Sequence, residues 1–217
     1  MSKISKMSIN ELESELFNGP DEATMWDIDT VVRSRSGIIQ IVSPEEGRVA
    51  YRLRQLAKLR GRKIIFWTCA SGLYEYDDDD QKKPYDMKVG GRPWDGLSGR
   101  LPFDPLTILD FIEVDDDIPA AQVAQYEKNG KKQSCSLGGG ANYVLFDLPN
   151  FMPSSKDGAR MTDGEIMLVR KLKDLREELL KNEEDKKTVI IFSRDIFIPS
   201  DLKKIIPVID WPLPNQN

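Results

Sequence analysis

The sequence predicts an α/β protein with a mainly parallel sheet of five strands. Short runs of apolar and β-branched residues alternate with segments of helical periodicity, which is typical of this fold class. The second of these runs, RKIIFWTC, is continuously apolar at its centre, as expected for a strand that helices cover on both faces. The five predicted strands lie at residues 37–42, 62–69, 142–148, 187–193 and 205–210.

The first predicted strand leads through one tight turn into a helix. The turn contains Ser43, which is expected to cap the helix, and Pro44, which suits a first helical turn. Glu46 lies three residues after Ser43 and completes a capping box, and Gly61 is expected to end the helix. A strand, a crossover helix and a second strand together predict a right-handed parallel unit.

This turn is also the place where a nucleotide-binding α/β protein carries its phosphate loop. Such a loop needs several residues, with glycines for close backbone approach, a lysine for the phosphates and a serine or threonine for magnesium. The turn here has no glycine and no lysine. Ser43, Glu45 and Glu46 are expected to satisfy the free N–H groups of the helix and to repel a triphosphate. The sequence therefore predicts that no nucleotide binds at this end of the helix.

Two helices are expected before the first strand. One spans residues 8–17, with Ser8 as its cap and Glu11 completing a capping box, and the other lies within residues 21–35. We therefore divide the chain into an N-terminal helical lead-in, residues 1–36, and an α/β domain, residues 37–214.

A loop insertion is expected within the domain at about residues 74–101. It contains four successive aspartates, at positions 77–80. These aspartates lack the alternate spacing of a calcium-binding loop. We therefore interpret the insertion as a solvated, mobile loop and not as a cation site.

Periodicity also assigns the segments between the second and third strands. A helix is expected at residues 104–113 and another at residues 118–128. Residues 129–140 are expected to form a loop. The three glycines at its end precede a strand and open no helix, so they favour a flexible approach to that strand over a phosphate nest.

A long helix is predicted before the fourth strand, and a short one follows that strand. Thr162 caps the long helix and Glu165 completes its capping box. The leucine stripe of this helix is too short for a coiled-coil seam and favours packing on the sheet. The short helix is expected at residues 199–204, before the fifth strand.

Composition excludes several classes of function. The chain has no histidine, which excludes Ser-His-Asp and Cys-His catalysis and the usual zinc sites. A net charge of −5 makes nucleic acid an unlikely partner. The arginines and lysines within residues 48–63 form the most basic region; we expect a solvated polar face there, with nucleic acid or an acidic partner as the alternative.

The expected compartment is the cytoplasm. No apolar run reaches the roughly 18–20 residues of a membrane span, and the N-terminus has no apolar core of a signal peptide. Cys69 and Cys135 match no metal or redox spacing and are expected to be reduced thiols.

Polar residues follow the third and fourth predicted strands. Asp147 stands at the C-terminal end of the third strand, where a parallel sheet has its usual ligand crevice. Ser193 and Arg194 end the fourth strand and lie beside Asp147 if the two strands are neighbours. Asp147 has two interpretations: it orders magnesium, as in an NTPase, or it accepts hydrogen bonds from nearby backbone N–H groups.

The order of these segments resembles the core of the AAA ATPases. The closer resemblance is to the degenerate N-terminal domain of an AAA ATPase family of cyanobacteria, chloroplast genomes and many bacteria. The matching segments are SPEEGRVAYRLRQLAKLRGRKIIFWTCASGL, DPLTILDFIE, NYVLFDLPNFM, VRKLKDLREEL, KTVIIFSRDIFIPSDLKK and VIDWPLP.

The resemblance implies a three-layer, P-loop NTPase-like fold from which the Walker A loop has been lost. Residues 43–49 then replace the Walker A region, Asp147 stands at the Walker B position, and Ser193 and Arg194 stand near sensor 1. The vestigial positions are Ser43, Glu46, Asp147, Ser193 and Arg194. The active AAA domain that follows in that family is not in this sequence, so its ATPase activity cannot be transferred.

We therefore expect a non-catalytic domain that binds protein, as a regulatory or assembly module of an AAA ATPase system. Its partner is expected to be an AAA ATPase or further copies of this chain, with no cofactor, metal or membrane. The alternative is a subunit that binds ATP and magnesium in a site that another chain completes. A carboxylate-based, metal-dependent nuclease or phosphatase would pair Asp147 with Asp110 or Asp115, but no paired-carboxylate signature supports it.

Overall fold

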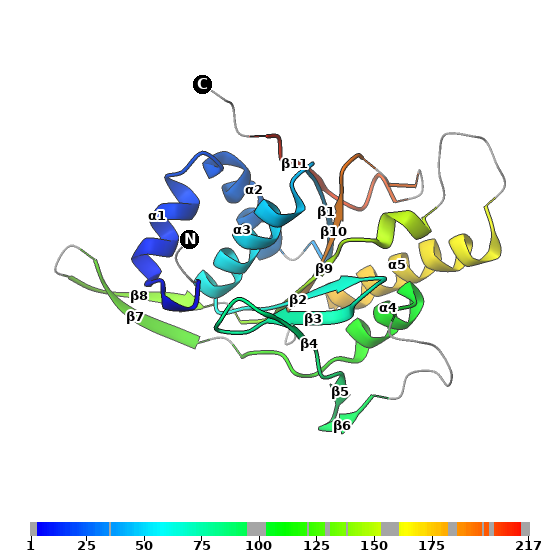
Figure 1. Cartoon of the computed structure of the whole chain (residues 1–217), viewed down its shortest axis with the longest axis horizontal. Coiled ribbons are helices and arrows are strands. Elements are labelled where there is room, and N and C mark those ends of the chain that lie inside the picture. The colour runs from blue at the N-terminus through cyan, green and yellow to red at the C-terminus, as the bar shows by residue number, and fades with distance from the viewer. Residues whose placement is uncertain are drawn as a thin grey trace.

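A seven-stranded sheet forms the centre of the described part of the chain (Figure 1). The computed structural model describes residues 4–34, 36–94, 103–120, 122–128, 131–137, 139–152, 161–181, 186–196, 198–199 and 202–213. The strand order is β11-β1-β10-β9-β2-β3-β4. The strands are β1 (Ile38–Val42), β2 (Lys63–Thr68), β3 (Gly72–Tyr76), β4 (Lys82–Pro84), β9 (Ala141–Leu145), β10 (Lys187–Ser193) and β11 (Val208–Asp210).

Five of these strands run parallel, and they are the five strands that the sequence predicts. Strand β1 pairs with β10 and β11, β10 pairs with β9, and β9 pairs with β2. The register places Val42 opposite Ser193 and Leu145 opposite Ile191. Since β9 and β10 are neighbours, the residues that follow them meet at one edge of the sheet.

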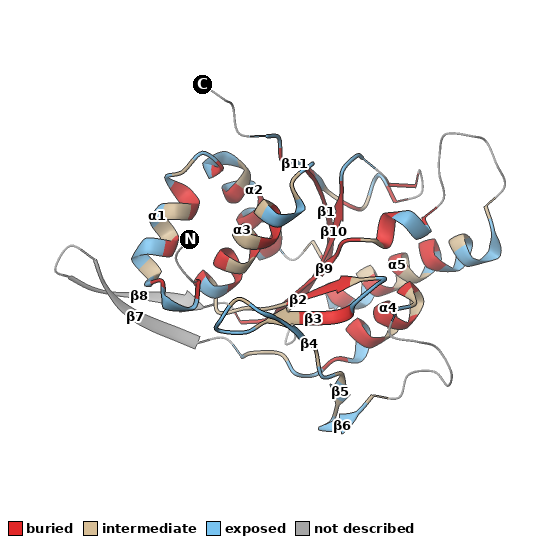
Figure 2. Cartoon of the chain, in the orientation of Figure 1, coloured by how far each residue is buried: buried red, intermediate tan, exposed pale blue. Residues whose placement is uncertain are grey.

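Helices cover both faces of the sheet, which confirms the three-layer α/β architecture (Figure 2). Helices α1 (Ile9–Phe17), α2 (Glu22–Arg33) and α3 (Glu46–Leu59) pack on one face, and α4 (Pro105–Val114) and α5 (Asp163–Lys181) pack on the other. Successive residues of a strand point to opposite faces, so Ile39 and Ile41 join the first core and Ile38 joins the second. The leucine stripe of α5 is buried in the second core, as predicted.

Two expectations about the connecting segments are wrong. Residues 122–128 form strand β7 and not a helix, and β8 (Lys131–Leu137) replaces the expected loop; the two strands pair as an antiparallel hairpin. The sequence between them is Asn129-Gly130, a strong hairpin signal that outweighs the weak helical periodicity.

The expected loop insertion also contains strands. Strand β3 pairs antiparallel with β2, β4 pairs antiparallel with β3, and β5 (Lys88–Val89) pairs with β6 (Arg92–Pro93). The physical reason is aromatic packing, because the rings of Tyr74 and Tyr76 lie 5.6 and 5.5 Å from the ring of Phe66. The aspartates 77–80 form the turn between β3 and β4, and residues 95–102 lie outside the described residues.

The helix starts follow the predictions at two of three capping boxes. Ser8 with Glu11, and Thr162 with Glu165, form the expected reciprocal hydrogen bonds. The third predicted capping box, Ser43 with Glu46, does not form. Helix α3 starts with Glu45 as its N-cap residue, and the hydroxyl of Ser43 accepts a hydrogen bond from the N–H of Glu45 at 3.3 Å. The helix therefore begins two residues later than a Ser43 cap would require.

Two further segments complete the comparison with the predictions. The helix expected at 104–113 is α4, capped by Asp104. The short helix expected at 199–204 lies partly outside the described residues, and residues 202–204 form a turn. Among the described helices, none combines the length and the apolar character that crossing a membrane requires.

Candidate functional site

A cavity of about 630 Å³ lies at the C-terminal ends of β9 and β10. Four of the five predicted positions line it: Glu46, Asp147, Ser193 and Arg194. The fifth, Ser43, is buried behind this surface and donates its backbone N–H to the carbonyl oxygen of Ser193 at 2.9 Å. The parallel topology brings these residues together, because β1, β9 and β10 all end at this edge.

Asp147 follows β9 and is half-buried. Its Oδ2 atom accepts a hydrogen bond from the backbone N–H of Cys69 at 2.8 Å. The same carboxylate contacts the Cys69 thiol and raises the pKa of that thiol, because the protonated thiol is the form that donates to it. One oxygen of Asp147 therefore fixes the end of β2 beside the end of β9.

Ser193 is held by a buried amide that the sequence analysis missed. The hydroxyl of Ser193 donates to the carbonyl oxygen of Asp195 at 2.7 Å and accepts from Nε2 of Gln40. Gln40 is fully buried in the middle of β1. Since the hydroxyl has a single proton and uses it on Asp195, it cannot donate to a phosphate in this arrangement. Gln40 is a polar residue inside the apolar run 37–42, and this position could have indicated a buried polar contact.

Glu46 lies in the first turn of α3, close to two tyrosines of β3. Burial raises the pKa of the Tyr74 phenol, and the nearby Tyr76, Glu46 and Asp147 raise it further. Burial likewise raises the pKa of the Tyr76 phenol, with Glu46 as a further cause. Both phenols therefore stay neutral at ordinary pH.

Negative charge predominates among the described residues that line the cavity. The ionisable ones are the carboxylates of Glu46, Asp147, Glu165 and Asp195 and the guanidinium of Arg194. Arg194 is exposed and forms no hydrogen bond or ion pair with the residues that the structure describes. These carboxylates do not converge on one point: within the described ranges, no three acidic, cysteine or histidine side chains are grouped so that they could hold a metal ion.

The other carboxylates considered from the sequence lie elsewhere. Asp110 pairs with Lys171 at 2.6 Å, and the buried Asp115 accepts hydrogen bonds from the hydroxyls of Tyr143 and Tyr85. Neither carboxylate lines the cavity with Asp147. The described structure therefore does not pair Asp147 with Asp110 or Asp115, as the nuclease or phosphatase hypothesis requires.

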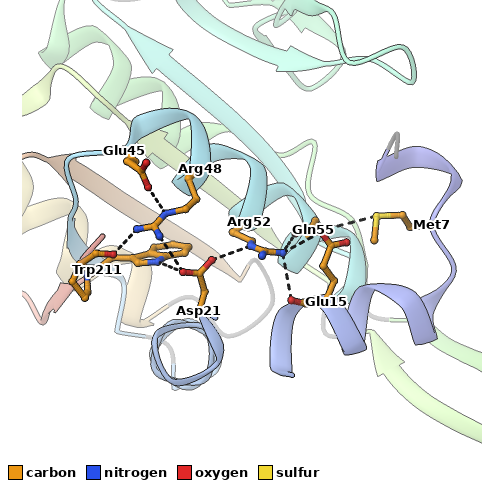
Figure 3. Close-up of polar contacts among 9 residues, drawn as sticks. Met7, Glu15, Asp21, Glu45, Arg48, Arg52, Gln55 and Trp211 are labelled. Atoms are coloured by element: carbon orange, nitrogen blue, oxygen red, sulfur yellow. Dashed lines mark hydrogen bonds and ion pairs between the residues drawn. The ribbon is translucent and has the colours of Figure 1, made fainter. Parts of the chain in front are cut away.

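The basic residues of α3 are engaged inside the molecule. Arg48 and Arg52 both bind the carboxylate of Asp21, at 3.3 and 3.2 Å (Figure 3). The indole N–H of Trp211 donates to the same carboxylate at 3.0 Å. Arg52 also pairs with Glu15 at 3.3 Å. These contacts replace the solvated polar face expected here and join the N-terminal helices, α3 and the C-terminal segment.

Lys58 and Arg60 extend this pattern along α3. The ammonium of Lys58 donates to the carbonyl oxygens of Ile4, Ser5 and Met7 at 2.6–2.9 Å. Arg60 forms a bidentate pair with Asp29, whose side chain is almost fully buried. The charges of these residues are therefore paired with groups inside the molecule.

Comparison with protein families agrees with this architecture. Residues 24–211 match the model of the SpoVK-like AAA ATPase, N-terminal domain. The match runs from α2 to Trp211 and so includes the five parallel strands and the cavity. Comparisons with curated proteins and with solved structures gave no match. The expected N-terminal domain of an AAA-type ATPase is thereby confirmed, while its cyanobacterial and chloroplast type stays a prediction. The chain belongs to the family of SpoVK-like AAA ATPase N-terminal domains.

Proposed function

We propose that this chain acts as a non-catalytic AAA-like domain, as a protein-interaction, regulatory or assembly module of an AAA ATPase system. In this proposal its Walker A region is degenerate and it uses no cofactor. Its partner is an AAA ATPase or further copies of the same chain, and it works in the cytoplasm. Membership of the family supports the AAA context, and the cavity supports the non-catalytic role.

The observation that carries the proposal is the charge at the front of α3. A bound nucleotide needs N–H donors and cations around its phosphates. The described lining of the cavity instead presents four carboxylates and one guanidinium, that of Arg194, and the turn before α3 contains no lysine or glycine.

The repulsion between phosphate and carboxylates is large enough to weaken nucleotide binding. A phosphate charge about 4 Å from a carboxylate that faces water is repelled by ~1 kcal/mol. Four such contacts would together offset about half of the ~8 kcal/mol of a micromolar complex. The lining therefore disfavours a triphosphate even where the shape of the cavity would admit it.

A thermal melt with ATP or ADP and magnesium tests this function. A nucleotide present at a hundred times its Kd would stabilise the fold by ~2.7 kcal/mol and raise the Tm. We expect no shift for the chain as it stands. A variant with Glu46→Gln and Glu165→Gln is the matched comparison, because a response that appears only after these charges are removed identifies repulsion as the cause.

The alternative is an ATP-binding subunit whose site another chain completes. It is favoured by one observation, namely that Asp147, Ser193 and Arg194 all line the same cavity. A turnover assay with an AAA ATPase partner, comparing the chain with its Arg194→Ala variant, separates the two functions. The alternative requires that Arg194→Ala lowers turnover and that ATP crosslinks to this chain. The proposed function requires that no ATP crosslinks here.

A further inference from the structure

Several apolar side chains on the segments that line the cavity remain exposed, and three of them closely follow its acidic residues in sequence. Ile166 and Met167 lie in the first turn of α5 and are 49% and 51% exposed, although α5 buries its leucine stripe in the core. Ile196 directly follows Asp195 and is 66% exposed. Packing within the described part of the chain does not use these side chains. Exposed apolar residues on segments that also line a polar cavity are consistent with an interaction site.

The charges of the cavity come from separate elements. Glu46 belongs to α3, Glu165 to α5, Asp147 to the end of β9, and Asp195 to the segment after β10. The fold therefore concentrates negative charge in one hollow that has apolar side chains on two of its contributing segments. A ligand that fits both features is cationic at its tip and apolar beside it.

We propose that the cavity receives an arginine or lysine side chain of a different, basic partner protein. Apolar residues that flank this side chain in the partner pack on Ile166, Met167 and Ile196. Carboxylates that accept from a guanidinium form charge-assisted hydrogen bonds, and the apolar contacts exclude water from them. This inference rests on the proposed non-catalytic function, because a nucleotide would occupy the same hollow.

Other occupants fit the observations less well. A second copy of the chain carries the same net charge of −5, and the arginines of its α3 are engaged in internal ion pairs. A metal ion would need a group of converging ligands, and the described residues contain none. Charge complementarity therefore selects a basic partner over a copy of the chain.

A peptide titration tests the inference on the full chain. The probe is a fluorescent twelve-residue peptide of alternating leucine and arginine, and its control has glutamate in place of arginine. Binding is followed by fluorescence anisotropy at low and high ionic strength. We expect the arginine peptide to bind and the glutamate peptide to remain free. The variant with Glu46→Gln and Asp195→Asn should bind the arginine peptide about tenfold more weakly, since each lost ion pair is worth up to ~1 kcal/mol.

A matched variant separates the effect of the cavity carboxylates on binding from the effect of the net charge of the chain. Glu22→Gln with Asp27→Asn removes the same charge from exposed positions of α2 and should change the affinity by less than about twofold. A further variant, Ile166→Ser with Met167→Ser, should also weaken binding. Equal losses in the cavity and α2 variants would overturn the inference, as would dimers of the chain that the cavity variant abolishes.

The outcome also separates this inference from the proposed function. If the arginine peptide fails to bind while ATP causes no shift in Tm, the inference alone is overturned. If ATP binds in the cavity, both the proposed function and this inference are overturned.

Discussion

The guanidinium of Arg62 donates hydrogen bonds at the N-terminal ends of three neighbouring strands, β2, β9 and β10. None of its described acceptors is a carboxylate. Burial lowers the pKa of Arg62 to about 10, so the group remains charged at neutral pH. The acceptors are the carbonyl oxygens of Gly139, Ala141 and Lys186 and the side chains of Asn142 and Thr188, at 2.8–3.2 Å.

Replacing this guanidinium should be costly. Arg62→Met leaves several buried acceptors without a donor, and we expect it to lower the free energy of unfolding by about 3 kcal/mol. Urea unfolding measures the change. Arg170→Met is the control, because its ion pair with Asp174 is exposed and should contribute less than about 0.5 kcal/mol. Equal losses in the two variants would contradict the role assigned to Arg62.

At the scale of elements, α3 is the helix that joins both ends of the described chain. Its Arg48 binds Asp21, the residue directly before α2, and donates to the carbonyl oxygen of Pro212 after β11. The guanidinium of Arg48 also lies 5.6 Å from the ring centroid of Trp211. Asp21 therefore links the start of α2 to two segments that are distant in sequence, α3 and the residue after β11 (Figure 3).

Asp21→Asn should loosen these segments together. Removing the charge weakens hydrogen bonds to Arg48 and Arg52, and we expect a loss of about 2 kcal/mol in the free energy of unfolding. Hydrogen exchange should become faster in α2 and β11 alike. Asp27→Asn, an exposed change on α2, should have neither effect. Faster exchange confined to α2 would show that Asp21 does not join the elements.

The first turn of α5 should depend on pH through Glu165. Hydrogen bonds from the backbone N–H and the hydroxyl of Thr162 lower the pKa of Glu165 below its ordinary value of 4.5. Because the folded pKa is the lower one, this contribution to stability is present above pH 4.5 and is lost as the pH falls through the lowered pKa.

Amide exchange of α5 between pH 5 and 3 tests this dependence. We expect the first turn to open progressively as the pH falls. Glu165→Gln keeps a hydrogen-bonding side chain at the third position of the box but cannot titrate, so its exchange should show a weaker dependence. An unchanged dependence in Glu165→Gln would assign the opening to other carboxylates.

At the scale of the molecule, the sequence contains enough information for the five parallel strands and for the meeting of Asp147 with Ser193 and Arg194. Those features follow from apolar runs and from the rule that parallel strands end at one edge. The strands of the expected insertion were missed because their tyrosines pack on Phe66 of β2, a contact between strands.

The network around Asp21 could not be predicted for a similar reason. Asp21 and Trp211 are 190 positions apart, and only the folded sheet brings them together. Basic residues on a helix are usually solvated, so their local pattern predicted a solvent-facing surface and not the internal ion pairs that the structure shows. The function of the cavity depends on the same long-range assembly, because its charges come from four separate segments.

In the proposed function, this hollow of the AAA-type domain excludes nucleotide because of its own carboxylates. Isothermal calorimetry of the full chain with ATP and magnesium measures this exclusion. We expect no binding heat up to millimolar ATP, so that any binding free energy is weaker than ~4 kcal/mol. A saturable isotherm with a micromolar Kd, abolished by Arg194→Ala, would contradict it.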